Sequence, residues 1–449
     1  MPVSFLLPDV HNRRLFDPTS PLDWAVSTVP TLSLLLAIRL AFEQPTSTTS
    51  KAFRYALCPL GIGATFMFCA SYDFSGGDPK FNSYNYGIGL AGFTIAMKHA
   101  ELVSLKRRPK RVYVRDLEKK RKDEDHSVTS SDGEDIKNNR LTPMNGNGWH
   151  SNGSVGHREE PPVSWKESFR YLCDPRGITY DFGASAFKAP EYRNVNNRTT
   201  FLLSSMWEVV FKLVMLDVFQ TIIQSVPGTT IGTPGGGSIF IEGVPAPVQF
   251  VVATLLSISM GSAIYCGMDL MHHNFTIVSV GLFGGDPAEH PPLFWKPLSG
   301  TSLRQLWSKR WHPLFRQEFT ALGFRIGNMV MGQLGGLLGV FMLSGLLHDV
   351  GIWGMGKGTD PWRIIGFFYL QGVGIALEGI WKKATGKSVG GPWGRLWTWS
   401  WMIATAHLVV EAWLQRGLGG DTILLPDKYR PILRLRDCII SYILTFTTK

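Results

Sequence analysis

Charged side chains are scarce in this chain of 449 residues: 18% are Asp, Glu, Lys or Arg, whereas 44% are hydrophobic. A soluble globular protein usually carries about 25% charged residues. The apolar residues are also gathered into runs of about 20, the length that crosses the hydrocarbon core of a bilayer. The composition therefore argues against a soluble protein and favours one that is embedded in a membrane.

Cysteine and histidine are also too sparse for the sites they often build. The five cysteines are scattered and form no C-x-x-C pair, so neither a disulfide framework nor a zinc site is expected. Among eleven histidines only His272 and His273 are adjacent, whereas membrane di-iron enzymes need repeated close sets. Asp269 and His273 lie four residues apart, a spacing that permits a shared metal ion. This stays the weaker alternative, and we predict no metal.

Nine apolar segments are candidate membrane spans. The three strongest are Phe201–Gln224, Val248–Met271 and Ile326–Leu347. The weaker six are Leu22–Phe42, Phe53–Tyr72, Tyr84–Val103, Trp362–Trp381, Trp397–Trp413 and Ile432–Phe446. Because lipid offers no partners to backbone groups, segments of this length must be helices. We predict an all-α, multi-pass bundle with roughly eight or nine transmembrane helices.

The positive charge is concentrated between two groups of spans. Residues 106–122 hold ten Lys or Arg and two acids. The positive-inside rule places this block in the cytosol, and nucleic-acid binding is disfavoured because the block adjoins a span and lacks interleaved aromatic residues. Residues 115–162 have almost no aliphatic side chains and cannot form a core. We therefore divide the chain into N-terminal helices (1–105), a basic, disordered cytosolic loop (106–162) and a membrane core (163–449).

This division predicts a topology, most simply in the endoplasmic reticulum. In sealed microsomes, added protease should cleave first within residues 106–162, because the loop faces the outside of the vesicle. The sequon at Asn152 should stay unglycosylated for the same reason. Protection of the loop, or a glycan on Asn152, would show that the orientation is reversed.

A histidine closes one apolar run, in Ser344-Gly345-Leu346-Leu347-His348-Asp349. Ionisable groups within spans are expensive and usually functional. His348 could be a general base that takes a proton from a hydroxyl, or it could cap the end of its helix. Earlier in the same run, Gly332-x-x-Gly335-Gly336-x-x-Gly339 contains two G-x-x-x-G pairs. They predict close approach of another helix, which would bury the helix of His348.

A second histidine follows a Trp- and Arg-rich stretch, Leu306-Trp307-Ser308-Lys309-Arg310-Trp311-His312-Pro313. The pattern Ser302-x-x-Gln305 resembles a capping box and predicts a helix start. Apolar residues at helical spacing, beside several cationic ones, predict an amphipathic interfacial helix. Pro313 should end that helix near His312. The alternative is a membrane-surface helix on which His312 is incidental.

Together these motifs resemble one family. The run from Pro292 to His312 is similar to the signature of wax-synthase-like membrane-bound O-acyltransferases. Ser344-Gly345-x-x-His348-Asp349 resembles the histidine motif of that superfamily, and Arg176-Gly177-Ile178 resembles an upstream motif. The resemblance covers roughly residue 162 to the end of the chain.

The resemblance implies a helical bundle with a tunnel, in which acyl-CoA, most simply acetyl-CoA, meets a hydrophobic alcohol. It implies that His348 is catalytic, that His312 is its polar partner, and that Arg310 and Trp311 contact the acyl-CoA. No permanently bound cofactor is expected. Fungal members that resemble this chain acetylate terpenoid or meroterpenoid secondary metabolites. A long-chain wax or sterol ester synthase and a non-enzymatic transporter stay as alternatives. The partners expected are the two substrates and membrane lipids, and the oligomeric state is open.

Overall fold

The computed structural model describes residues 7–10, 12–115, 163–184, 186–421 and 426–447. These residues form an almost wholly helical structure, with one short parallel pairing of β1 (Arg14–Leu15) and β2 (Tyr72–Asp73). The predicted all-α class is confirmed. Most of the predicted cytosolic loop, residues 116–162, lies outside the described residues.

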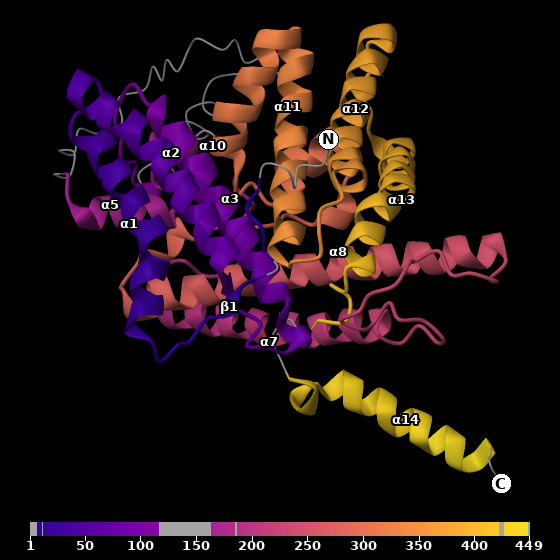
Figure 1. The fold of residues 1–449 in the computed structure, drawn as a ribbon. Helices are drawn as coiled ribbons and strands as arrows, with labels where there is room; N and C mark the ends of the chain where they lie inside the picture. The colour runs from indigo at the N-terminus through magenta and orange to yellow at the C-terminus, as the bar shows by residue number, and fades with distance from the viewer. Residues whose placement is uncertain (1–6, 11, 116–162, 185, 422–425, 448–449) are drawn as a thin grey trace.

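Each of the nine predicted apolar segments is helical within the described ranges (Figure 1). The long helices are α1 (Pro21–Glu43), α2 (Thr48–Ser71), α3 (Ser83–Val103), α7 (Arg198–Ile223), α8 (Ala246–Ile277), α11 (Arg325–Gly354), α12 (Pro361–Thr385), α13 (Gly391–Gln415) and α14 (Pro431–Thr447). The short ones are η2 (Pro79–Phe81), α5 (Trp165–Cys173), α6 (Asp181–Ala184), η3 (Val278–Leu282), η4 (Pro287–Glu289), η5 (Pro297–Ser299), α9 (Leu303–Gln305), η6 (Leu306–Arg310), α10 (Arg316–Glu318), η7 (Phe319–Phe324) and η8 (Asp427–Tyr429).

Five helical stretches of the described residues are long and apolar enough to cross a membrane: Pro21–Glu43, Thr48–Ser71, Ala246–Leu282, Arg316–Gly354 and Pro361–Thr385. α7, one of the three strongest candidates in the sequence, is not among them. In Figure 1, α7 and α8 run across the direction of α11, α12 and α13. Since helices with such different directions cannot all be normal to one bilayer, the number of spans stays a prediction.

The predicted span Ile326–Leu347 is wrong as a single straight helix. Met331 (φ −132°, ψ 24°) and Gly332 (φ 59°, ψ −150°) leave the helical conformation and reverse the chain. The stretch is a helical hairpin, whose first arm is residues 316–330 and whose second arm is residues 333–354. Gly332 fits the turn because only glycine adopts this positive φ without strain.

Glycines hold the two arms of the hairpin together. A Cβ on Gly323 would lie 2.6 Å from the Gly339 carbonyl oxygen, and one on Gly327 would overlap the carbonyl of Gly335. The predicted glycine face therefore does receive a closely packed helix, as small residues allow. That helix is the preceding arm of the same hairpin.

Buried charges join this hairpin to the N-terminal helices. The Lys98 ammonium on α3 lies 2.8 Å from Glu101 and 2.6 Å from Glu318 of α10. All three side chains are buried. Removing one partner of such a group typically destabilises a fold by about 3–5 kcal/mol, because the others are left buried without a counter-charge. The foot of the hairpin is therefore fixed against α3.

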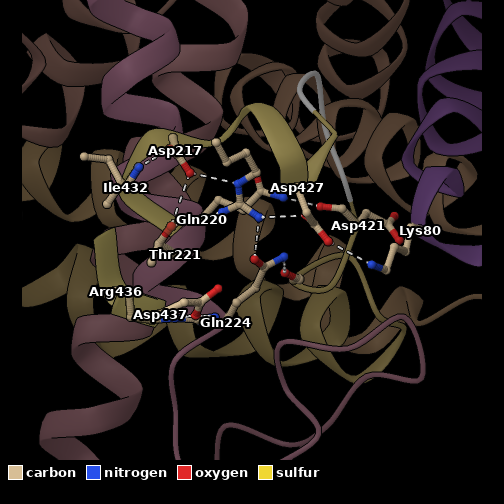
Figure 2. A network of polar contacts seen from close by, with 12 residues as sticks. Lys80, Asp217, Gln220, Thr221, Gln224, Asp421, Asp427, Ile432, Arg436 and Asp437 are labelled. Carbon is tan, nitrogen blue, oxygen red and sulfur yellow. Dashed lines mark hydrogen bonds and ion pairs between the residues drawn. The ribbon is translucent and has the colours of Figure 1, made fainter. Parts of the chain in front are cut away.

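The C-terminal helix α14 is held through a buried arginine that precedes it. Arg430 donates to Asp217 (2.8 Å), Gln224 (2.7 Å) and Thr221 (3.1 Å) of the α7 region. Figure 2 shows this network, in which the Ile432 backbone N–H also donates to Asp217, over 2.8 Å. Beyond it, α14 extends away from the other helices in Figure 1.

Candidate active site

The helix predicted to lead to His312 begins where expected. The Ser302 hydroxyl accepts the Gln305 N–H at 3.0 Å, so Ser302 is the N-cap of α9. The chain then widens into the π-turn η6, which the Trp311 N–H closes on the Leu306 carbonyl at 2.8 Å. Trp311 is extended (φ −91°, ψ 151°). The helix thus ends at Arg310, two residues before His312, near the position that Pro313 predicts.

The apolar side of this short helix faces protein, which corrects the interfacial prediction. Leu303 is fully buried, and the Trp307 ring lies 5.8 Å from Phe341 of α11 and 6.4 Å from Phe368 of α12. A stripe of apolar residues has the same spacing whether it meets lipid or a neighbouring helix. The sequence pattern alone could not separate the two.

His312 lies among aromatic rings. Phe294 packs edge-on at 5.9 Å between ring centroids, and Trp311 and Phe315 lie at 5.7 and 6.4 Å. Its Nδ1 atom is buried and has no hydrogen-bond partner among the described residues. Burial lowers the pKa of His312 to about 3, and the charges of nearby His348 and Arg176 act in the same direction. At neutral pH the ring is therefore uncharged and can offer one hydrogen bond to a ligand.

His348 lies on the second arm of the hairpin, in a defined tautomer. Its Nδ1 is 2.7 Å from the Ser344 carbonyl oxygen. A carbonyl oxygen only accepts, so Nδ1 carries the proton and the lone pair is on Nε2. The ring stacks on Phe368, at 4.4 Å and 26°. In the described part of the chain nothing hydrogen-bonds to Nε2, which leaves it available as a base.

The hairpin explains why the two histidines are brought together. Gly323 packs on Gly339 and Gly327 on Gly335, so the two pairs share one antiparallel register. His312 lies just before the first arm and His348 near the end of the second, and the two are close enough for a charge on His348 to act on the pKa of His312. Phe368 adds a second link, because its ring contacts both His348 and Trp307.

Arg310 is buried and ties the π-turn to the preceding loop. Its guanidinium donates to the Lys296 carbonyl (3.0 Å), the Trp295 carbonyl (3.3 Å) and the Gln305 side chain (3.1 Å), and it lies 4.5 Å from the centroid of the Trp295 ring. Lys296 is in the left-handed region (φ 43°), a strained conformation that these bonds help to hold. Arg310 is a structural anchor, and its contact with acyl-CoA stays a prediction. For Trp311 the ring contacts are with Phe294, Trp307 and His312.

A substitution can separate these two roles of Arg310. If its charge binds phosphate, Arg310→Ala should raise the KM for acyl-CoA several-fold more than the KM for the acceptor, because charge-assisted hydrogen bonds to the phosphates are lost. Steady-state kinetics with each substrate varied in turn measure this difference. Lys309→Ala, at the exposed neighbouring position, is the control for loss of charge alone. Equal changes in both KM values would assign Arg310 to the loop only.

Arg176 lies beside the site, although no local pattern in the sequence singles it out and only the family resemblance points to it. It donates to the Pro291 (2.7 Å) and Pro292 (3.2 Å) carbonyls and leaves its Nε buried without a partner among the described residues. Burial lowers its pKa to about 10, so it stays charged at neutral pH. The turn of residues 173–180 is packed inward, and Tyr180 is fully buried.

Two further histidines near Arg176 also have unpaired ring nitrogens. Nε2 of His290 and Nε2 of His272 are buried without a partner among the described residues. Burial lowers the pKa of His290 to about 4, with Arg193 and Arg176 acting in the same direction. His272, His290 and the guanidinium of Arg176 therefore form a buried polar cluster that is suited to polar or anionic oxygen atoms.

The weak metal candidate is an ion-pair cluster in the structure. Glu208, Asp269 and His273 place one ligand atom each within 4.8 Å of one another. The Lys212 ammonium lies 2.9 Å from Asp269 and 3.8 Å from Glu208, and the Arg193 guanidinium lies 3.4 Å from His273. Lys212 already pairs with both acids and the Arg193 guanidinium occupies His273 Nδ1, so a dication would have to displace them. We therefore assign the cluster to the packing of α7 on α8.

Residues 290–370 match the model of the membrane bound O-acyl transferase family. This segment contains His312 and His348, and the resemblance predicted from the motifs is confirmed over it. The Aspergillus terreus acetyltransferase ataH is 25% identical over 248 residues, which are 49% of this chain and 82% of the relative. The Calcarisporium arbuscula acetyltransferase aurG is 30% identical over 210 residues, 42% of this chain and 49% of the relative.

A plant protein shows the same similarity over a shorter stretch. The long-chain-alcohol O-fatty-acyltransferase of Simmondsia chinensis is 29% identical over 106 residues, 22% of this chain and 30% of the relative. The chain thus spans less than half of two of these three relatives. The match to the family model is what covers the segment with both histidines. The activity of the whole chain is a proposal.

Proposed function

We propose that this protein is a membrane O-acyltransferase that transfers an acyl group from acyl-CoA to the hydroxyl of a hydrophobic alcohol. The observation that carries the proposal is the tautomer of His348, whose free Nε2 stands near His312 at the foot of the glycine hairpin. An unprotonated ring nitrogen in a dry, aromatic setting is the group that general-base activation of an alcohol requires.

The reaction follows from these groups. His348 Nε2 takes the hydroxyl proton as the alcohol oxygen attacks the thioester carbonyl carbon. The carbonyl oxygen gains negative charge, which a hydrogen bond from neutral His312 and the positive field of Arg176 would stabilise. When the intermediate collapses, the C–S bond breaks, and the protonated His348 returns its proton to the departing CoA thiolate. The products are an ester and CoA, and no redox step occurs.

The identity of the acyl group is the finer part of the proposal. Two of the relatives are named acetyltransferases and come from fungi, which supports acetyl-CoA as donor. A secondary metabolite of terpenoid type as acceptor is proposed from the resemblance of the motifs. The plant relative is named for long-chain alcohols and fatty acyl groups, which keeps a wax or sterol ester synthase as the second candidate.

One assay separates the two candidates. Microsomes that contain this chain are incubated with labelled acetyl-CoA or palmitoyl-CoA and a panel of terpenoid, sterol and long-chain alcohols. We expect ester formation from acetyl-CoA with a terpenoid alcohol. Preference for palmitoyl-CoA would favour the wax or sterol ester synthase, and no ester with any pair, from protein shown to be folded, would count against acyl transfer.

A further inference from the structure

Glu378 of α12 is a buried carboxylate with no part in the chemistry above. It is 6% exposed. Its Oε1 accepts the Leu303 backbone N–H at 2.6 Å and the Trp397 indole N–H at 3.1 Å. Its Oε2 accepts the Arg304 backbone N–H at 3.1 Å. One side chain therefore joins α12 to α13 and to the first turn of α9.

These bonds complete the start of α9. The first N–H groups of a helix have no partner within the helix and must find one elsewhere. Ser302 satisfies the Gln305 N–H, and Glu378 satisfies the other two, those of Leu303 and Arg304. A negative charge at this end also suits the helix dipole. Without Glu378, the buried Leu303 donor would be left unpaired and the part-buried Arg304 donor would lose its acceptor.

The segment that Glu378 holds leads directly to His312. Leu303 is fully buried against Gly374, four residues before Glu378 on α12. Trp307 then packs toward Phe368 of the same helix, and Phe368 stacks on His348. α12 thus contacts the start and the middle of the segment as well as the other histidine.

We propose that Glu378 is a positioning residue: by fixing the start of α9 on α12, it sets the place of His312 relative to His348. It acts through the segment 303–312 and touches no substrate. The proposal rests on the proposed function in one respect: it assumes that His312 takes part in acyl transfer.

The test uses chemical reactivity, so it does not depend on acyl transfer. In the full chain with its five cysteines replaced, His312→Cys introduces one thiol at the buried position. The rate of its alkylation by N-ethylmaleimide is measured on detergent-purified, monodisperse protein. Adding Glu378→Ala should accelerate alkylation about 10-fold or more, since a lost constraint of about 1.4 kcal/mol corresponds to a factor of ten in the open population. Glu378→Gln keeps one acceptor oxygen and should give an intermediate rate.

Glu411 offers a matched control on α13. It is also buried and also accepts a backbone N–H, that of Ile239 at 2.7 Å, together with the Ser238 hydroxyl at 2.8 Å. Glu411→Ala should leave the alkylation rate of the thiol at position 312 unchanged. Equal rates with and without Glu378→Ala, or equal acceleration by Glu411→Ala, would overturn the proposal.

Turnover is measured separately in the parent with His312 intact. Glu378→Ala should lower kcat about 10-fold or more and change the KM for acyl-CoA little, because a displaced His312 affects the reacting carbonyl more than CoA binding. Faster alkylation with unchanged kcat would support the positioning role and refute the part of His312 in transfer. The two hypotheses therefore fail in different ways.

Discussion

Replacing His348 with alanine should abolish acyl transfer while the protein still folds. An alcohol is almost entirely protonated at neutral pH, and a positioned base typically contributes about 10²- to 10⁴-fold to the rate. The loss should be at least that large, because the adjacent carboxylate cannot replace the base: Asp349 accepts the Asp360 N–H of the next loop at 2.7 Å. Product formed per milligram of monodisperse protein measures the effect.

The fold should tolerate this substitution for local reasons. The Nδ1–H of His348 bonds to a carbonyl of its own helix, so its removal strands no distant partner. Alanine is also the better helix former. The matched control is His407→Ala on α13, whose ring lies between Phe240 and Phe250 and bonds to Thr254 at 3.3 Å. We expect it to leave turnover within a few-fold. Near-normal turnover of His348→Ala would mean that this histidine has only a structural role.

The sequence was a good guide to the helices because length and apolar composition are local properties. It was a poor guide to the reversal at Met331 and Gly332. A hydropathy window averages over about 20 residues and stays high when a chain turns back inside an apolar region. The glycines that make the turn and the packed arms were visible, and their spacing correctly indicated a close helix contact. The spacing did not show that the helix in contact would be the preceding arm of the same hairpin.

The candidate site was likewise only partly predictable from the sequence. His312 and His348 stand out because each closes a recognisable pattern, and their catalytic roles stay predictions. Phe368 and Glu378 could not be found, since their importance comes from contacts across the fold: Glu378 lies 75 positions from Leu303, whose N–H it accepts. A carboxylate within an apolar helix is a reason to look for a partner, but the sequence does not identify that partner.

The second large effect concerns the hairpin that carries His348 and follows His312 in the chain. Gly335→Ala should destabilise the protein by about 3 kcal/mol or more, at the upper end of overpacking effects, because the new Cβ would overlap the carbonyl oxygen of Gly327. Backbone cannot rotate aside as a flexible side chain can, so the arms must separate. Because His312 directly precedes the first arm and His348 lies on the second, turnover should fall about 10-fold or more as well. Thermal unfolding in detergent and turnover of the surviving folded fraction measure the two effects.

Packing of the hairpin arms predicts two further results that a general sensitivity to glycine substitution would not predict. Gly366→Ala on α12 adds the same methyl group where nothing lies within 4 Å, and it should be neutral or slightly stabilising. Gly327→Ala should resemble Gly335→Ala, because its Cβ would overlap the carbonyl oxygen of Gly335. The double variant should then cost less than the sum of the single ones, since arms that have separated for one methyl group already accommodate the other. Additive losses, or an equal loss from Gly366→Ala, would show that the two arms do not pack through these glycines.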